Sequence, residues 1–184
     1  MGGVIPRAGV ALAVAMATLA PSARAEVVSA SANGFMVRHS VEVATSPEQV
    51  WETLVQPAQW WQSSHTLSGS SANLTLDLRP GGCWCEALTG GGGIEHLRVL
   101  AVVPNQLLRF AGALGPLQQY PVRGVLDFVL TPIPGAGRTR ITLTYSVSDG
   151  GTGSVEGMAG PVDSVLGTQL DSLKSAAEAA VGTG

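Results

Sequence analysis

The chain has 184 residues, of which 45% are hydrophobic and 12% are charged. It has 10 basic and 13 acidic residues, and the basic ones form no cluster. This argues against nucleic acid and anionic membrane surfaces as partners. This length suits one domain with a sizeable core. A chain with this many apolar residues is expected to pack densely, to line a cavity or to expose an apolar patch.

The N-terminus is typical of a secretory signal peptide. Arg7 precedes an apolar run over residues 8–20, which is shorter than the about 20 residues needed to span a bilayer. An A-x-A cleavage pattern ends at Ala25. We therefore predict that residues 1–25 are removed, that the protein is secreted or periplasmic, and that it makes no stable membrane insertion. A buried N-terminal helix and an uncleaved anchor are the alternatives.

Segments of alternating apolar and polar residues follow. Residues 26–34 are small and polar, and we expect a flexible lead-in there to a single domain over residues 35–184. The first alternating segment, 35–44, places His39 on its apolar face. Six further segments share the pattern and are separated by Gly, Pro or Asn: 74–79, 83–88, 95–103, 106–113, 121–131 and 138–148.

Two short helices are predicted between the first and second strands. Ser46 is a suitable N-cap, Pro47 suits the first helical position, and Gln49 can complete a capping box. A second helical turn carries Trp60 and Trp61. Because two adjacent indoles are not expected to point into one core, one of them should face a cavity mouth or solvent.

Residues 157–181 predict one long amphipathic helix. Apolar residues recur there at steps of three and four, Pro161 suits the first turn, and Asp163 and Gln169 fall mainly on the polar side. After a run of strands, such a helix has only the sheet on which to bury its apolar stripe. The expected fold class is α+β, with about six to seven strands.

Four stretches resemble one known group of proteins. They are Ser46-Pro-Glu-Gln-Val-Trp, Leu76-Asp-Leu-Arg-Pro-Gly-Gly, residues 99–110 and Gly137-Arg-Thr-Arg-Ile-Thr-Leu-Thr-Tyr. They are similar to the START-like (SRPBCC) superfamily, closest to the branch that holds homologues of the activator of a heat-shock chaperone ATPase and polyketide-cyclase-like proteins. The resemblance implies a Bet v 1-like helix-grip fold, in which a curved antiparallel sheet wraps around the long C-terminal helix and encloses a cavity. Export argues against the co-chaperone role, and the cavity implies a small apolar ligand.

The two cysteines, Cys83 and Cys85, are too close in sequence for an ordinary disulfide if their strand is flat. Their Cα atoms would then lie about 6.5–7 Å apart, at or beyond the usual limit. A strained bond, an intermolecular bridge and two free thiols all remain open. If the glycine-rich turn after residue 88 is symmetric, both thiols share a face with His96, and the three could hold zinc or copper. We expect no metal there, because no fourth ligand is evident.

Catalytic motifs are scarce. The sequence has no G-x-S-x-G and no H-E-x-x-H, and its glycine run lacks the lysine of a phosphate-binding loop. A general base beside an enolisable carbonyl would have to be Glu86, Asp127, His39 or His96. No catalytic residue and no cofactor is assigned from the sequence.

Three hypotheses follow for function. The first is a carrier of a small hydrophobic molecule, which predicts a continuous cavity with few polar groups. The second is a cyclase- or hydrolase-like enzyme, which predicts a buried His or Glu within hydrogen-bond reach of another polar group in the cavity. The third is a protein-interaction module with an unknown partner, which predicts an exposed patch around Trp60 and Trp61. The predicted ligand contacts are Trp51, Trp60, Trp61, Trp84, Phe110, Phe128, Tyr145 and His39.

Overall fold

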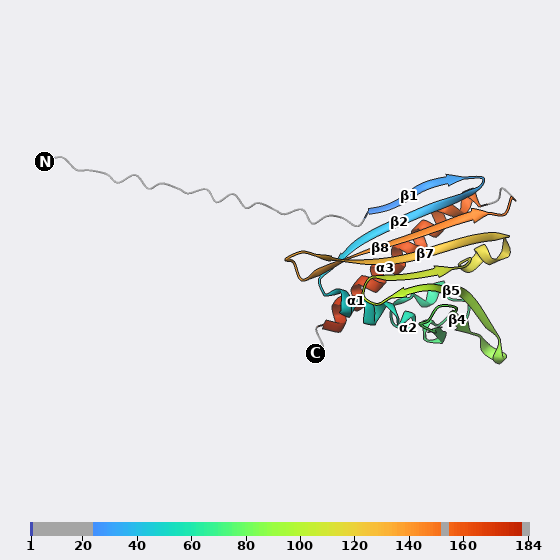
Figure 1. Cartoon of the computed structure of the whole chain (residues 1–184), viewed down its shortest axis with the longest axis horizontal. Helices are drawn as coiled ribbons and strands as arrows, with labels where there is room; N and C mark the ends of the chain where they lie inside the picture. The colour runs from blue at the N-terminus through green and yellow to red at the C-terminus, as the bar shows by residue number, and fades with distance from the viewer. Residues whose placement is uncertain (2–23, 152–154, 182–184) are drawn as a thin grey trace.

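One curved antiparallel sheet organises the molecule (Figure 1). The computed structural model describes Met1 and residues 24–151 and 155–181, so the predicted signal peptide lies almost wholly outside the described residues. The strand order is β1-β2-β8-β7-β6-β5-β4-β3. The strands are β1 (Arg24–Ser31), β2 (Gly34–Val43), β3 (Leu74–Leu76), β4 (Cys83–Ala87), β5 (Gly93–Val103), β6 (Leu107–Ala111), β7 (Val122–Ile133) and β8 (Arg138–Asp149).

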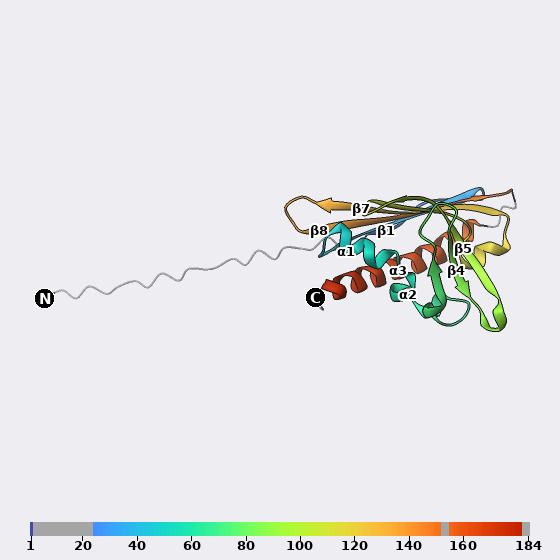
Figure 2. The same ribbon diagram turned by 60° about the horizontal axis from the view of Figure 1, so that its bottom comes forward.

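The helices cover one face of this sheet. They are α1 (Pro47–Leu54), α2 (Pro57–Trp60) and α3 (Ala159–Val181), and Figure 2 shows all three on the same side. The same view shows β4 and β5 bending away from the plane of the long strands toward the helices. The predicted α+β helix-grip fold is confirmed, with eight strands in the sheet of the described residues instead of six to seven.

The additional strand is β1, at a place where the sequence indicates a flexible lead-in. Apart from Val27 and Val28, its residues are small or polar and carry little strand signal of their own. They are ordered by pairing with β2, in which Glu26 lies opposite Arg38 and Val27 opposite Val37. The expectation of a lead-in is therefore wrong for residues 26–31, which lie within β1, because the hydrogen bonds of a neighbouring strand can outweigh weak local propensity.

Helix α1 begins as the sequence predicts. The hydroxyl of Ser46 accepts the N–H of Gln49 at 3.4 Å, and the side chain of Gln49 accepts the N–H of Ser46 at 3.4 Å. Pro47 occupies the first helical position, where a missing N–H leaves no helical bond unmade.

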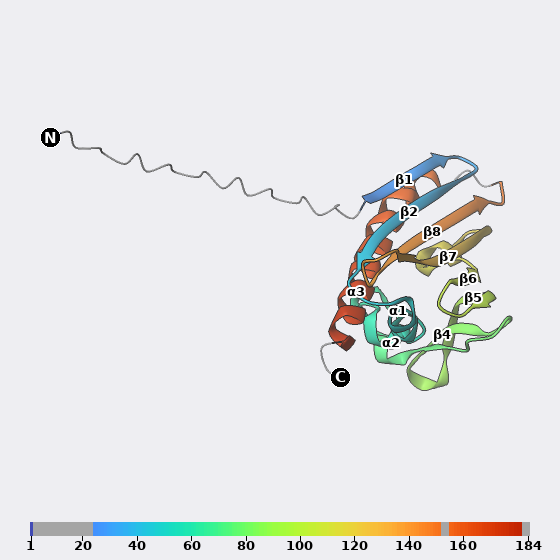
Figure 3. The same ribbon diagram turned by 60° about the vertical axis from the view of Figure 1, so that its left-hand side comes forward.

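Helix α3 lies across the sheet and contacts β2, β1 and α1 (Figure 3). Its apolar stripe is buried at Leu166, Leu170, Leu173 and Ala177. Gln169, assigned from the sequence to the polar side, is buried as well, and its side-chain oxygen accepts the N–H of Gln62 at 2.8 Å. Among the described helices, none combines the length and the apolar character that crossing a bilayer requires.

Candidate ligand pocket and a buried Glu–His pair

A bulge in the β4–β5 pairing determines which side chains of this hairpin point inward. Trp84 pairs with Leu97, but Cys85 pairs with Glu95, so His96 is the extra residue of β5. Bulges re-aim side chains, and both His96 and Leu97 are buried. The prediction that His96 shares a face with the two cysteines is therefore wrong, because it assumed unbroken alternation along β5.

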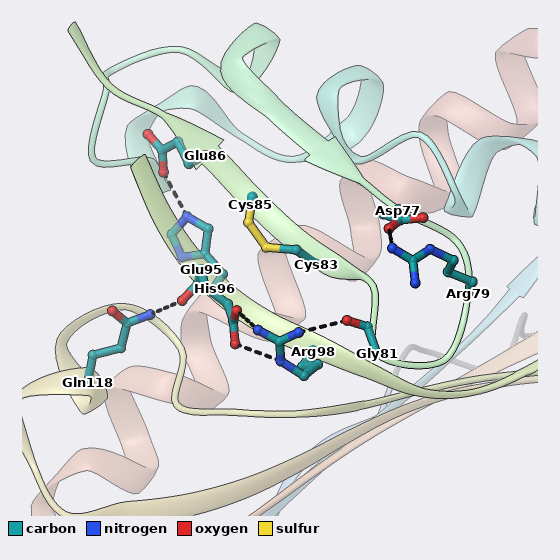
Figure 4. The surroundings of a disulfide bond; sticks show 10 residues. All are labelled: Asp77, Arg79, Gly81, Cys83, Cys85, Glu86, Glu95, His96, Arg98 and Gln118. Atoms are coloured by element: carbon teal, nitrogen blue, oxygen red, sulfur yellow. Dashed lines mark hydrogen bonds and ion pairs between the residues drawn. A yellow bond between two sulfur atoms is a disulfide. The ribbon is translucent and has the colours of Figure 1, made fainter. Parts of the chain in front are cut away.

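Cys83 and Cys85 form a disulfide on the outer face of β4 (Figure 4). Their Cα atoms lie 5.4 Å apart, within the range that a disulfide accepts. The separation is shorter than that of a flat strand, and the register shift lies between Trp84 and Cys85. The argument against an ordinary disulfide fails because it treated β4 as flat. The sulfurs are bonded to each other and His96 lies on the opposite face, so the three cannot converge on a metal.

Glu86 and His96 form a buried pair on the inner face (Figure 4). Oε2 of Glu86 lies 2.8 Å from Nε2 of His96. The carboxylate also accepts the backbone N–H of Leu67 at 3.1 Å and that of Ser68. Burial raises the pKa of Glu86, but hydrogen bonds from Ser68, Leu67 and His96 outweigh this effect and lower the pKa to about 2. Glu86 is therefore ionised at neutral pH although it is only 1% exposed.

A pocket of about 330 Å³ lies beside this pair. It is lined by residues at the end of α2 and the following loop (Trp61, Ser64, His65, Thr66, Leu67), in β3–β5 (Leu74, Trp84, His96), between β6 and β7 (Leu114, Gly115, Pro116, Leu117), just before α3 (Met158) and in the first turns of α3 (Pro161, Val162, Val165, Leu166). Ser64, His65, Thr66 and His96 are its polar side chains. The pocket is thus mainly apolar, and the ionised Glu86 stands directly behind one of its polar groups.

Tyr145 fixes the pocket wall between β6 and β7. Its hydroxyl donates to the carbonyl of Gly112 at 2.9 Å and accepts the N–H of Leu114 at 3.1 Å. Burial raises the pKa of Tyr145 to about 12, although the bond from Leu114 acts in the opposite direction. Gly124 makes this contact possible, because a Cβ there would lie 2.7 Å from the Tyr145 oxygen and 2.3 Å from the Gly112 carbonyl oxygen.

Comparison with known proteins gives the family. Residues 35–178 match the family described as "Polyketide cyclase / dehydrase and lipid transport". The chain belongs to this family. This match confirms the resemblance to the START-like superfamily and, within it, to the polyketide-cyclase-like proteins.

Several solved structures share the fold of this protein. The protein MLL2253 from Mesorhizobium loti is 23% identical, with a TM-score of 0.54 over 77% of this chain and 95% of that one. CV1439 from Chromobacterium violaceum is 17% identical, with a TM-score of 0.53 over 78% and 96%. CalU16 from Micromonospora echinospora is 18% identical, with a TM-score of 0.52 over 77% and 73%. No curated protein matches the chain.

The aromatic residues predicted as ligand contacts divide into two groups. Trp61 and Trp84 line the pocket. The remaining aromatic residues pack in the core away from its lining: Trp51, Trp60, Phe110, Phe128 and Tyr145. Their role as ligand contacts stays a prediction.

Both indoles of the tryptophan pair are buried, at 4% exposure for Trp60 and 9% for Trp61. Each makes an edge-on contact with Trp84, at ring separations of 5.9 and 5.1 Å. The premise that they cannot share one core is wrong, because Trp84 offers ring surface to both. The expectation that one of them faces a cavity is met by Trp61, which lines the pocket. The exposed patch that the interaction-module hypothesis requires is not formed by these residues.

His39 lies away from the pocket. Its Nε2 is 2.9 Å from Oδ1 of Asp163 on α3. Gly167 packs over the ring so closely that a Cβ there would lie 2.9 Å from Cε1 of His39. Asp127 lies elsewhere again, where both of its oxygens accept the guanidinium of Arg109, at 2.8 and 2.7 Å. Of the four candidate bases, the structure thus brings only Glu86 and His96 together at the pocket.

Sequence reasoning missed the wall formed by residues 114–117. This segment reads as a Gly/Pro loop, and its position depends on Tyr145, which is distant in sequence. The only available signal was the Gly112–Gly115–Pro116 spacing, which indicates a fixed turn but not what it faces.

Proposed function

We propose that this protein binds a small hydrophobic molecule in the pocket between β3–β5, residues 114–117 and the start of α3. The observation that carries the proposal is the mainly apolar pocket of about 330 Å³. Sites for small ligands are typically concave, apolar and supplied with a few polar groups that fix orientation. The family, whose description includes lipid transport, is consistent with this role.

Trp61 and Trp84 are the proposed principal contacts. Their rings lie 5.1 Å apart at an angle of 82°, so together they form two sides of a corner on the pocket wall. Indole rings supply a large apolar contact area at low cost in conformational entropy. A bound ligand should therefore change their fluorescence.

The test is a titration with 1-anilinonaphthalene-8-sulfonate, together with native mass spectrometry of the purified protein. Val165 is partly buried and lines the pocket, so Val165→Trp should fill it and weaken binding by about tenfold or more. Leu100→Trp adds the same indole at a residue that is 48% exposed, away from the pocket, and should leave binding unchanged. Equal binding by both variants would contradict the proposal.

The polar pair favours a second candidate, an enzyme on the same scaffold. That hypothesis requires a buried His or Glu beside another polar group in the pocket, and Glu86 with His96 meets the requirement. Binding without turnover and binding with turnover both begin with the same pocket, so the enzyme hypothesis extends the first proposal.

We further propose that the protein is exported and that its mature chain begins at Glu26. The apolar run with its A-x-A pattern supports this proposal. The Cys83–Cys85 disulfide supports it too, because disulfides persist mainly in oxidising compartments. Intact-mass analysis of the protein from its native host should give a chain that starts at Glu26 and lacks two thiol hydrogens. A chain that retains Met1 and two free thiols would contradict export.

A further inference from the structure

The Cys83–Cys85 disulfide lies on the outer face of the β4–β5 hairpin (Figure 4). Both cysteines are partly exposed to solvent, whereas Trp84 between them and Glu86 after them are buried. A disulfide that solvent reaches is open to attack by a dissolved thiolate without unfolding of the chain. The bond therefore lies where exchange with an external thiol can take place in the folded protein.

Stabilisation of the fold gives little reason for a bond at this place. Its two cysteines are separated by only 2 positions in the sequence, and a disulfide stabilises less when the loop that it closes is shorter. Strand β4 is already held on both sides by β3 and β5, and the carbonyl of Cys83 accepts the N–H of Asp77 at 2.9 Å. These backbone bonds also keep the two cysteines close together after the disulfide opens, so that it can form again.

The charged side chains around the bond make its two sulfurs unequal. Arg98 lies directly opposite Cys83 in the β4–β5 pairing, and Glu95 lies opposite Cys85. The guanidinium of Arg98 is held on this face by the carboxylate of Glu95 and by the carbonyl of Gly81, to which Nη1 donates at 2.7 Å (Figure 4). A neighbouring cation stabilises a thiolate, and a neighbouring carboxylate opposes it. Negative charge is therefore better placed on the sulfur of Cys83 than on that of Cys85.

A second ion pair lies in the turn between β3 and β4. Arg79 and Asp77 are 2.9 Å apart there, and both are well exposed (Figure 4). Neither lies opposite a cysteine in the pairing of the strands. Arg98 is thus the cation that the sheet places against Cys83, and Arg79 offers a matched control on the same hairpin.

We propose that the Cys83–Cys85 bond is a redox-active site that exchanges with small thiols, in which Cys83 is the sulfur that is attacked and Arg98 is the positioning residue that stabilises its thiolate. The substrate is a low-molecular-weight thiol, and the product is its disulfide. This activity is separate from ligand binding, because the bond lies on the face of β4 opposite to Trp84 and the pocket.

The reaction balances in two exchanges. The thiolate RS⁻ attacks the Sγ atom of Cys83, the bond to Cys85 breaks, and Cys85 leaves as a thiolate that takes up a proton. A second RS⁻ attacks the R sulfur of the mixed disulfide, and Cys83 leaves as the thiolate beside Arg98. Two thiols are thus oxidised to RSSR, and the disulfide of the protein is reduced to a dithiol. The reverse sequence, with RSSR as the oxidant, restores the bond.

The first test follows reduction of the mature chain by mercaptoethanol and reoxidation by its disulfide. Both reagents are uncharged in their main forms, so the surface charge of the protein does not attract or repel them. Alkylation followed by intact-mass analysis counts the thiols. The bond should open and close again in native buffer, with the far-ultraviolet circular dichroism of the folded protein retained throughout. Reduction only at urea concentrations that unfold the chain would overturn the proposal.

Single-cysteine variants show which sulfur exchanges. Cys85→Ser leaves Cys83 beside Arg98, and Cys83→Ser leaves Cys85 beside Glu95. The first variant should form a mixed disulfide with the mercaptoethanol disulfide about tenfold faster than the second at neutral pH, because a larger fraction of its thiol is ionised. Equal rates, or a faster reaction of Cys83→Ser, would overturn the assignment of Cys83.

The role of Arg98 is tested in the Cys85→Ser background. Arg98→Gln should raise the pH at which alkylation of Cys83 is half-maximal and slow formation of the mixed disulfide about threefold or more at neutral pH. Arg98→Lys keeps the positive charge and should restore most of both effects, and Arg79→Gln should react like the background. An unchanged pH profile in Arg98→Gln, or the same loss in Arg79→Gln, would overturn the role of Arg98.

Discussion

The two ends of the sheet differ in regularity, and the difference explains where the pocket lies. At one end, the edge strand β1 has a shift between Val27 and Ser29, but β2 and β8 then pair without a shift over Gly34–Val43, and β7 and β8 do so over Val122–Ile133. At the other end, both the β4–β5 and the β5–β6 pairings contain a bulge. Unbroken alternation buries every second side chain of these strands on the face that the helices cover, and this closes the core. The bulges bend the sheet and turn a histidine inward, which leaves a space with a polar group in its wall.

The first prediction tests whether the two ends differ in packing. Leu143→Ala at the regular end removes a fully buried side chain and should cost about 3–4 kcal/mol, because it opens a new cavity. Leu74→Ala, at a 4% exposed residue that lines the pocket, enlarges an existing space and should cost about 2 kcal/mol or less. Urea denaturation of both variants gives the comparison. Equal costs would show that the core is no more closed at one end than at the other.

The second prediction concerns acid stability at the bulged end. Glu86 has a folded-state pKa of about 2 against an ordinary value of 4.5, so its ionised form stabilises the fold above about pH 4.5, and this stability is lost as the pH falls toward 2. The contribution is on the order of 3 kcal/mol at neutral pH. Glu86→Gln should therefore be much less stable than the wild type at neutral pH and approach it near about pH 2.

Chemical denaturation across this pH range measures the difference. Glu52→Gln removes an exposed carboxylate and controls for the change in net charge. If the free energies of unfolding of the wild type and Glu86→Gln differed by the same amount at every pH, the carboxylate would not be the stabilising group.

The smallest expected effect is that of the disulfide. The Cys83–Cys85 bond closes the shortest of loops, with a sequence separation of 2, so the loop-entropy model gives it only about 1.5 kcal/mol. The double substitution to Ser should lower stability by this amount. It should also change the near-ultraviolet circular dichroism of Trp84, which lies between the two cysteines. The change should be larger for Trp84 than for the aromatic side chains of β7 and β8. An unchanged tryptophan signal would show that the disulfide does not hold the bend of β4.

The sequence by itself determined the elements with strong local periodicity. The alternation of residues 138–148 and the stripe of residues 157–181 predicted β8 and α3, and the capping residues Ser46 and Gln49 predicted the start of α1. These features depend on neighbours within a few residues, so they can be predicted from the sequence alone. They were sufficient for the fold class, and the resemblance added the helix-grip arrangement.

The tertiary structure decided the site. Pairing with β2 ordered β1, a bulge reversed the side on which His96 lies, and a bend brought Cys83 and Cys85 within bonding distance. The pair of Glu86 and His96 depends on that same bulge. A shift of one residue in the register of a strand exchanges its two faces, and register is set by contacts between strands. Local pattern cannot fix it, which is why the sequence offered both residues as candidates without bringing them together.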